Sequence, residues 1–362
     1  MGPVPRDVSD LSLVGLGGDS EVKNESSISE SATSSSQPEP CNAGGPVISA
    51  DLGTCPENAF PRTKFVPPTC ATVCAVVVTH HPDGGLCDRI RRIVSQVSDT
   101  VVVDNGSSSN CVEQLRTLAR DLDVQLVLNH CNEGLANALN AGCQWAAEHG
   151  YPWVLYLDQD TVAMPDMVET LSEAFGCYPR PDQLAVIGSN RRDKRNGWIS
   201  SDGDALLKSC SAVERVVVLM SGSLLSMGVF QAIGGFRADF FIDCVDFEYC
   251  LRARSKGFHV LKTVRPVMEH AIGHPTEHRL LWKTVVASNH SPMRHYFVAR
   301  NSLIMVGKYF LQEPKWMGKY VWAWIKLFVC VVLFEEQRIF KLMSIVRGCF
   351  DGILGRTEWH PH

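Results

Sequence analysis

Three patterns that mark common classes of protein are missing from this 362-residue sequence. The first predicted strand leads into THHPDGG, which is not the G-x-G-x-x-G turn of dinucleotide-binding proteins, and the chain contains no P-loop. An excess of basic residues is also missing, because 34 Lys and Arg stand against 39 Asp and Glu. The missing glycine turn disfavours an NAD- or FAD-dependent oxidoreductase. The net charge of -5 disfavours a nucleic-acid partner.

The 14 cysteines include no C-x-x-C pair. They are scattered, and several lie in apolar or helical patterns, such as Cys143 before Trp145 and Cys250 before Leu251. In a long chain this scatter is typical of buried, reduced thiols in the cytosol rather than of a disulfide framework. The first residues also lack a basic segment followed by an apolar one, so we expect no secretion signal.

Residues 1–70 differ in composition from the rest of the chain. They are rich in Ser, Gly, Pro and acidic residues, include SESATSSSQPEP, and show little apolar periodicity. Such a segment cannot bury enough apolar surface to offset the entropy that ordering costs. We therefore expect a disordered leader over 1–70, and a folded domain that begins at residue 71.

From residue 71 onward, strand-like runs alternate with helical patterns. Helical periodicity covers 86–97, begins again near Val112, and covers 136–148. The strand-like runs are apolar and rich in β-branched residues, which is typical of strands buried on both faces. They are ATVCAVVVTH, TVVVDN, VQLVLN and WVLYLD. This alternation predicts βαβ units and an α/β fold, which by itself identifies no function.

Polar residues directly follow three of the predicted strands. They are His80-His81-Pro82, Asp104-Asn105-Gly106-Ser107 and Asp158-Gln159-Asp160. Ligands of open α/β sheets bind beyond the carboxyl ends of the strands, so these residues are candidates for a binding site. The two carboxylates of the third group could hold Mg²⁺ or Mn²⁺, which would neutralise a departing diphosphate. An isolated triplet of this kind is more often a plain turn or a helix cap.

A second acidic cluster lies in GGFRADFFIDCVDFEYCLRARSKGF. A carboxylate in this cluster could take the proton of an acceptor hydroxyl as that hydroxyl attacks. The alternative is an acidic helix N-terminus whose carboxylates pair with arginines one turn further on. The charged residues concerned are Asp239, Asp243, Asp246, Glu248, Arg252 and Arg254.

His270, in VMEHAIGHPTEH, is a candidate metal ligand, although a lone histidine is more often structural. His274 and His278 follow at four-residue spacing, which could imitate a helical metal site. Gly273 and Pro275 interrupt any such helix, so a three-histidine zinc site is excluded.

Eight segments, taken in order, resemble those of a GT-A-fold glycosyltransferase of family 2, and within it the bacterial rhamnosyltransferases. The resemblance extends over residues 73–356 and implies a Rossmann-like mixed sheet flanked by helices, with a C-terminal helical extension. The segments are VVVTHHP, VVVDNGS, NEGLANALNAG, LYLDQDT, SGSLLS, IGGFRADFFIDCVDFEYCLRA, EHAIG and NHSPMRHYFVARNSL.

The same resemblance implies roles for individual residues. Asp160 would bind the metal with His270 and Asp158, and Asp246 would be the catalytic base, with Asp243 as the alternative. The family's acidic pair is only half present, because its first member falls on Val245. The nucleotide-sugar would be bound by Thr79, His81, Asp104, Asn105, Asn132, Asn140, Asp158, Gln159 and Arg252. Arg252 and Arg254 would contact the diphosphate or stabilise their loop.

The C-terminal segment 311–362 contains the apolar stretch WMGKYVWAWIKLFVCVVLF, from Trp316 to Phe334. Lys319 and Lys326 interrupt it, and its aromatic residues suit a headgroup boundary. We expect an amphipathic helix that rests on a membrane surface; a buried core helix and a true membrane span are the alternatives.

The activity implied is that of an inverting, metal-dependent rhamnosyltransferase with dTDP-L-rhamnose as donor. The acceptor would be a lipid-linked O-antigen or exopolysaccharide precursor, or a rhamnolipid, met at the cytoplasmic face of a bacterial inner membrane. The alternatives are a family 2 enzyme that uses another sugar, carried by UDP, and an inactive protein of this fold that serves as a scaffold.

Overall fold

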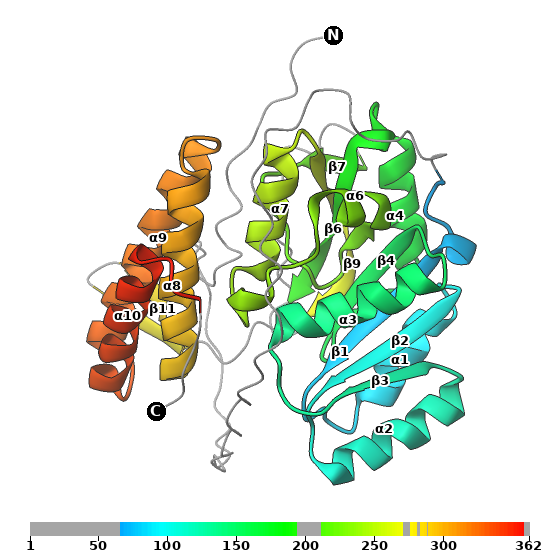
Figure 1. Ribbon diagram of the computed structural model, residues 1–362, viewed down its shortest axis with the longest axis horizontal. Helices are drawn as coiled ribbons and strands as arrows, with labels where there is room; N and C mark the ends of the chain where they lie inside the picture. Colours follow the sequence, from blue (N-terminus) through cyan, green and yellow to red (C-terminus); the bar gives the residue numbers. More distant parts are fainter. Residues whose placement is uncertain (1–65, 194–210, 271–275, 281–282, 288, 358–362) are drawn as a thin grey trace.

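The computed structural model describes residues 66–193, 211–270, 276–280, 283–287 and 289–357. These residues form a mixed sheet with helices on both faces, and a separate layer of three C-terminal helices beside it (Figure 1). The predicted leader, residues 1–70, lies outside the described residues except for its last five. Within those five, the Val66 carbonyl accepts a hydrogen bond of 2.8 Å from the Trp153 indole, so the described fold starts slightly before residue 71.

The first half of the sheet is parallel, as the alternation of strands and helices predicts. Its strand order is β3-β2-β1-β4, and every pair within it runs parallel. The strands are β1 (Val73–Thr79), β2 (Asp99–Asn105), β3 (Gln125–Asn129) and β4 (Trp153–Asp158). The helices that connect them are α1 (Leu86–Val94), α2 (Ser109–Leu122) and α3 (Leu135–Glu148), after a short 3-10 turn, η2 (Cys70–Thr72).

The second half makes the sheet mixed, as the GT-A resemblance implies. β8 pairs antiparallel with both β4 and β6, and β9 pairs parallel with β6 and antiparallel with β5 and β7. The strands are β5 (Val162–Ala163), β6 (Leu184–Asp193), β7 (Ala212–Glu214), β8 (Leu224–Ser226) and β9 (His259–His270). The helical elements are α4 (Met167–Gly176), η3 (Pro181–Gln183), α6 (Met227–Ile233), η4 (Ala238–Phe240) and α7 (Val245–Ser255).

Each face of the sheet carries its own apolar core. On β1, Cys74, Val76 and Val78 join the core on one face, whereas Val73 and Val77 join the core on the other. The whole of β1 is buried, which explains why its sequence is continuously apolar instead of alternating. Burial on both faces fixes the position of this strand, and therefore of the polar residues that follow it.

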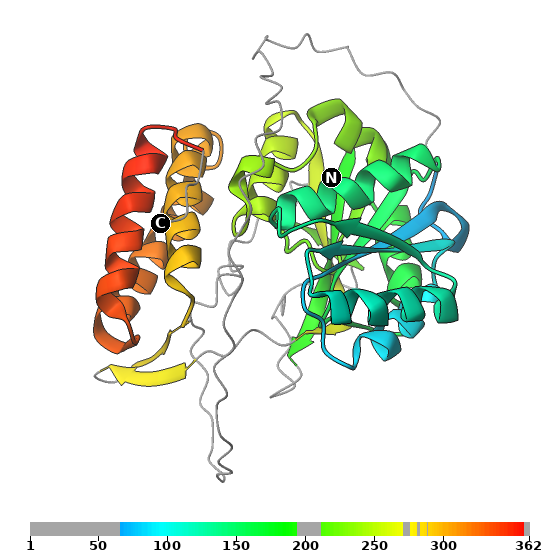
Figure 2. The same ribbon diagram turned by 60° about the horizontal axis from the view of Figure 1, so that its bottom comes forward.

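The C-terminal layer is larger than the segment 311–362. It contains α8 (Pro292–Tyr309), α9 (Pro314–Phe334) and α10 (Arg338–Ile353), with the hairpin of β10 (Thr276–Leu280) and β11 (Lys283–Ala287) at one end (Figure 2). Two glycines of α10 allow close packing on α8. A Cβ at Gly348 would lie 2.3 Å from the Tyr296 carbonyl oxygen, and one at Gly352 would lie 2.8 Å from that of Arg300. By its packing, α8 therefore belongs with the C-terminal helices.

Helix α9 is long and apolar enough to cross a membrane by length and composition, and a third of its most apolar window is buried inside the protein. Its buried face includes Trp316, Met317 and Tyr320. The Phe247 ring of α7 packs edge-on against both Trp316 and Tyr320. This face of α9 is thus part of the protein core.

Candidate active site

A buried pair of polar side chains joins the carboxyl ends of β1 and β2. The hydroxyl of Thr79, the last residue of β1, donates to Asp104 Oδ1 over 3.0 Å, and both residues are buried. The Asp104 carboxylate also accepts from the backbone N–H of Ser107 at 2.9 Å and from the Ser107 hydroxyl at 2.5 Å. Three donors therefore satisfy this buried carboxylate, and together they fix the loop that follows β2.

Asparagine side chains connect that loop with the segment before α3. Asn105 Nδ2 donates to Asn132 Oδ1 over 3.0 Å, and Asn105 Oδ1 accepts from Asn129 and from the Glu133 N–H, both at 3.1 Å. Gly106, which follows Asn105, has φ of +78°, and a Cβ at this position would lie 2.3 Å from the backbone carbonyl carbon of Cys131. The structure thus brings together Asn105 and Asn132, which the sequence predicts in one pocket.

The turn after β4 is tied to the end of β1 by Gln159. Its amide accepts from the His80 N–H at 2.8 Å and donates to the His80 carbonyl at 3.2 Å. His80 Nδ1 lies 3.0 Å from the Asn105 carbonyl oxygen, and burial lowers the pKa of this imidazole, which is therefore neutral at pH 7. His81 follows with φ of +48°, and its N–H donates to the Ser107 hydroxyl at 2.8 Å.

Asp158, Asp160 and His270 come together at the same end of the sheet. Each offers a ligand atom, and these atoms lie within 4.8 Å of one another; His270 Nδ1 is 3.5 Å from Asp160 Oδ1. Burial raises the pKa of Asp158, and the nearby His270 opposes that rise. Two carboxylates and an imidazole, all partly exposed, fit a divalent ion such as Mn²⁺ or Mg²⁺.

A short antiparallel pairing brings His270 to the two aspartates. Strand β5 pairs with the end of β9, so that Val162 lies opposite Glu269, next to His270. Thr161 then lies with its hydroxyl 3.0 Å from His270 Nδ1 and 2.8 Å from the hydroxyl of Ser221. Ser221 in turn accepts from the Asp158 N–H at 3.0 Å.

Thr161 and Ser221 hold the triad in place but receive no role from sequence reasoning. Both are buried and lie in the motifs LYLDQDT and SGSLLS. A histidine that binds a metal usually has a hydrogen-bond partner at its other ring nitrogen, and this partner fixes the orientation of the ring. The Thr161 hydroxyl is placed to do this for His270. The sequence signal for the role of Thr161 is its position, because it is a hydroxyl residue directly after the second aspartate of Asp158-Gln159-Asp160.

The two candidates for the base have different surroundings. Asp243 forms an ion pair with Arg294, whose Nη2 and Nε lie 2.6 and 3.1 Å from the two carboxylate oxygens. Asp246, at the start of α7, faces no arginine in this way; it accepts from the Phe247 N–H at 2.9 Å and from the Met220 backbone. Both carboxylate oxygens of Asp243 are thus engaged by the Arg294 guanidinium. The Asp246 carboxylate accepts from backbone N–H groups instead, which leaves it better suited to accept a proton.

Burial raises the pKa of Asp246 to about 7. Three hydrogen bonds from the backbone N–H groups of Phe247, Asp246 and Met220 oppose the rise, and the charge of Asp243 adds to it. A carboxylate with a pKa near the working pH is suited to accept a proton during catalysis. Met220 is followed by Ser221, which bonds the Asp158 backbone, so one short segment contacts both Asp246 and the metal triad.

The loop that carries Asp243 has an unusual backbone. Phe241, Asp243 and Cys244 have φ of +56°, +62° and +62°, although none of them is glycine. Asn301 of α8 holds this loop, because its Nδ2 donates to the carbonyls of Phe240, Ile242 and Asp243 at 2.9–3.0 Å. Arg300 supports Asn301 by donating to its Oδ1 from Nε at 3.1 Å. This supplies a physical role for the pair Arg300-Asn301, which the motif NHSPMRHYFVARNSL contains.

Of the two roles that the resemblance gives Arg252, the structure favours stabilisation of its loop. Its guanidinium donates to the carbonyls of Ile233, Gly234 and Gly235 at 2.6–2.9 Å, and it also pairs with buried Glu248 at 3.1–3.2 Å. An arginine has five N–H donors, and four hydrogen bonds to these partners use most of them. Arg252 therefore ties the end of α6 to α7, in agreement with the alternative reading as a helix i,i+4 pair.

Arg254 and Asn140 are likewise committed to structural partners. Arg254 pairs with Glu313 at 2.6 Å and with Glu214 at 3.2 Å, which fastens α7 to the start of α9 and to β7. The Asn140 amide accepts from the Phe236 N–H at 2.8 Å and donates to its carbonyl at 2.9 Å. The structure does not bring either residue together with the triad of Asp158, Asp160 and His270.

Comparison with known proteins agrees with this geometry. Residues 74–202 match the model of glycosyl transferase family 2. The chain is 26% identical over 306 residues to the dTDP-rhamnosyl transferase RfbF of Shigella flexneri, and the match covers 79% of this chain and 97% of that protein. The relative is thus matched over nearly its whole length.

Two solved structures share the fold. The mannosyltransferase PcManGT from Pyrobaculum calidifontis, in complex with GDP-Man and Mn²⁺, is 15% identical with a TM-score of 0.51, covering 81% of this chain and 90% of that chain. TarS 1–349 from S. aureus, in complex with UDP, is 11% identical with a TM-score of 0.53, covering 79% and 82%. These two likenesses show the GT-A fold, and the sequence matches to glycosyl transferase family 2 and to RfbF define the class as a glycosyltransferase. Within that class, residues 74–202 match family 2, and the sequence as a whole resembles a rhamnosyltransferase.

Proposed function

We propose that this protein is an inverting rhamnosyltransferase that uses dTDP-L-rhamnose. The observation that carries the proposal is the site at the carboxyl end of the sheet, where Asp158, Asp160 and His270 form a triad. The adjacent residues Met220 and Ser221 contact Asp246, whose pKa is raised, and the backbone of Asp158. The choice of donor is supported by the relative whose name is dTDP-rhamnosyl transferase, matched over 97% of its length.

Asp160 and His270, with Asp158, would hold a divalent ion, Mg²⁺ or Mn²⁺. Such an ion, when bound, neutralises the charge that develops on a departing nucleoside diphosphate. The chain's own contribution is to position these ligands: Ser221 and Thr161 orient them through hydrogen bonds of 2.8–3.0 Å. The end of the sheet also supplies the polar residues around Asp104 and Asn105, beside which the nucleotide would lie.

Asp246 would accept the proton of the acceptor hydroxyl as its oxygen attacks the anomeric carbon of the donor. The new bond joins the acceptor oxygen to that carbon, and the bond from the carbon to the diphosphate oxygen breaks, with its electron pair leaving on dTDP. A single displacement inverts the anomeric configuration, and no covalent sugar–enzyme intermediate forms. Asp243 is the less suitable base because Arg294 holds its carboxylate in an ion pair.

The proposed acceptor is lipid-linked: an O-antigen or exopolysaccharide precursor, or a rhamnolipid. Such an acceptor places the enzyme at the cytoplasmic face of the inner membrane, in peripheral contact with lipid. Apolar side chains exposed on α9 and α10 support this placement.

The deciding experiment measures released nucleoside diphosphate from a panel of dTDP-, UDP- and GDP-sugars, with Mn²⁺ or Mg²⁺ present. We expect dTDP release from dTDP-L-rhamnose, lost with a chelator and in Asp160→Asn, and kept in the matched surface control Asp121→Asn. Asp121 is exposed on α2, away from the triad. A preference for a UDP-sugar would overturn the donor proposal. Failure of a folded sample to bind any nucleotide-sugar would point to the scaffold alternative.

A further inference from the structure

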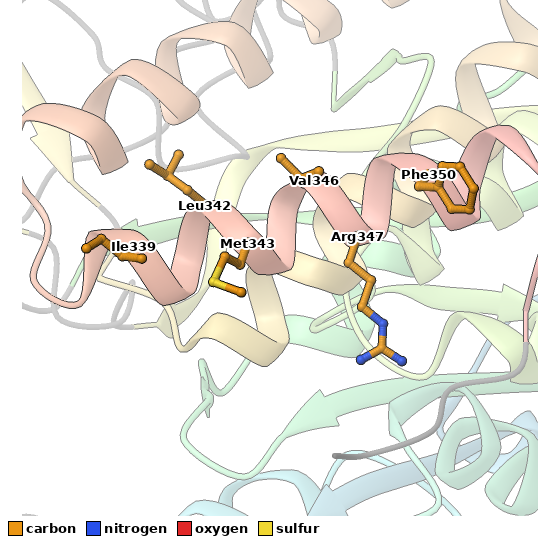
Figure 3. A pocket seen from close by; sticks show the side chains of 6 residues that line it. All are labelled: Ile339, Leu342, Met343, Val346, Arg347 and Phe350. Carbon is orange, nitrogen blue, oxygen red and sulfur yellow. The ribbon is translucent and has the colours of Figure 1, made fainter.

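Helix α10 presents a row of apolar side chains that no other described part of the protein covers. Except for one adjacent pair, they recur every three or four residues, so they lie along one side of the helix. Figure 3 shows six side chains along this helix, of which only Arg347 is charged. The exposed members are Ile339 (69% exposed), Phe340 (65%), Met343 (65%), Val346 (66%), Phe350 (57%) and Ile353 (75%). We call these six residues the α10 stripe.

The opposite side of α10 is already used in packing. Ile345 and Gly348 are buried against α8, and the buried Lys341 pairs with Glu335 at 2.8 Å. Because the packed side is the opposite one, the α10 stripe remains uncovered by the described residues, and large uncovered apolar patches are sites of contact with a membrane or another protein. Both views of the molecule place α10 on the side of the helical layer that faces away from the sheet (Figures 1 and 2).

The charges around the stripe have one predominant sign. Over residues 311–357, all of which are described, a single acidic side chain, Glu336, is exposed, while six basic ones are. They are Lys315, Lys319, Lys326, Arg338, Arg347 and Arg356. The whole chain has a net charge of -5, so this basic region has the opposite sign to the protein as a whole. A basic region with an apolar stripe is complementary to an anionic lipid surface.

We propose that α10 lies in the plane of an anionic lipid bilayer, with the α10 stripe inserted between the lipids and Arg338, Arg347 and Arg356 at the headgroups. Helix α9 also exposes apolar side chains, but at 38–59% they are less exposed as a group than the α10 stripe, at 57–75%. They are Trp322, Ile325, Phe328, Val329 and Leu333. In this proposal the α10 stripe is the main contact with lipid, and the exposed side of the stretch from Trp316 to Phe334 adds to it. This inference rests on the proposed function, since contact with a bilayer brings the enzyme to a lipid-linked acceptor.

A second copy of the chain fits this surface less well. In a two-fold dimer the same patch meets itself, so the arginines around the stripe would face arginines of the other copy. Such an arrangement brings like charges together, whereas an anionic bilayer neutralises them. The lipid surface is therefore the occupant that both the apolar stripe and its charges favour.

The test is sedimentation of the full-length protein with vesicles of equal parts phosphatidylcholine and phosphatidylglycerol, and with vesicles of phosphatidylcholine alone. We expect binding to the anionic vesicles, weakened by salt, and at least about tenfold weaker binding to the neutral ones. The double variant Met343→Glu with Val346→Glu should lose more than about tenfold in partitioning. Leu311→Glu is the matched control: Leu311 is 92% exposed and outside the α10 stripe, so its vesicle binding should stay unchanged.

Release of dTDP from dTDP-L-rhamnose in solution separates this inference from the proposed function. The double variant should keep that release, because neither position contacts the candidate active site. Wild-type protein that ignores anionic vesicles, or a double variant that binds them equally well, would overturn the inference whatever the enzyme's donor. A wild-type dimer in light scattering, made monomeric by the double variant, would assign the stripe to a second copy instead.

Discussion

Replacing Asp246 by Asn should slow the enzyme and stabilise it at the same time. The side chain lies half-buried at the start of α7, and burial raises its pKa from an ordinary value of 3.8 to about 7. Asn keeps the shape and can still accept from the Phe247 N–H, but it carries no charge and takes no proton. The variant therefore separates two effects of the carboxylate: its role as the catalytic base, and the folding free energy that is lost when its charge is buried.

The sign of the stability effect follows from proton binding. Between pH 3.8 and about 7 the folded state holds a proton that the unfolded state has released, so the free energy of unfolding falls as the pH rises. A pKa difference of this size corresponds to roughly 4 kcal/mol, and the residual contact of Asp246 with solvent reduces this to ~2 kcal/mol. For a domain of this size, that is about 4 to 8 °C in Tm.

The assay compares Tm and transfer rate for wild type and Asp246→Asn across the pH range. We expect a gain in Tm that grows from pH ~4 to pH ~7 and is constant above, with a loss of roughly 10² to 10⁴ in the transfer rate. The wild-type rate itself should fall as the pH drops below ~7, because Asp246 becomes protonated. Transfer within tenfold of wild type would refute the assignment of the base. A lower Tm at pH ~8 would refute the burial argument.

Three further results follow from other parts of the structure. Asn301→Asp should lower the free energy of unfolding by about 1 to 3 kcal/mol, measured by denaturant titration, because a carboxylate oxygen would face three carbonyls. Asp160→Asn should weaken Mn²⁺ binding by at least about tenfold in calorimetry, while a folded protein that binds Mn²⁺ unchanged would remove Asp160 from the triad. Gly348→Leu should push α10 from α8, because even a Cβ would lie 2.3 Å from the Tyr296 carbonyl; limited proteolysis should then cut α10 faster than in Met343→Ala.

Much of the first half of the fold can be predicted from local sequence. Strand β1 is buried on both faces, and a strand of that kind needs a continuous apolar run, which VCAVVVT supplies. The helices α1 to α3 fall within a few residues of the predicted ranges for the same reason, since their buried side recurs at helical spacing. The polar residues after these strands are then placed by the sheet itself.

The triad is different, because it depends on a pairing that leaves almost no local signal. Strand β5 has two residues, too few for any periodicity, yet its pairing with β9 brings His270 beside Asp160 across about 110 positions of sequence. Only the resemblance to family 2 glycosyltransferases connects these residues in advance. The two possible roles of Arg252 could not be separated for a similar reason: an arginine on a helix near acidic residues suits an anion, whereas three of its partners are backbone carbonyls of Ile233, Gly234 and Gly235, far away in sequence.

The helical layer is coupled to the chemistry through α8. The loop before α7 has φ of +56° at Phe241 and +62° at Asp243, conformations that cost non-glycine residues of the order of 1 kcal/mol each and persist only when the surroundings hold them. Asn301 holds that loop from α8, and α10 packs on the same helix through Gly348. The helix proposed to touch lipid is thus one layer away from the loop that leads into Asp246. A membrane contact through α10 would therefore stabilise the helix on which the geometry of the base depends.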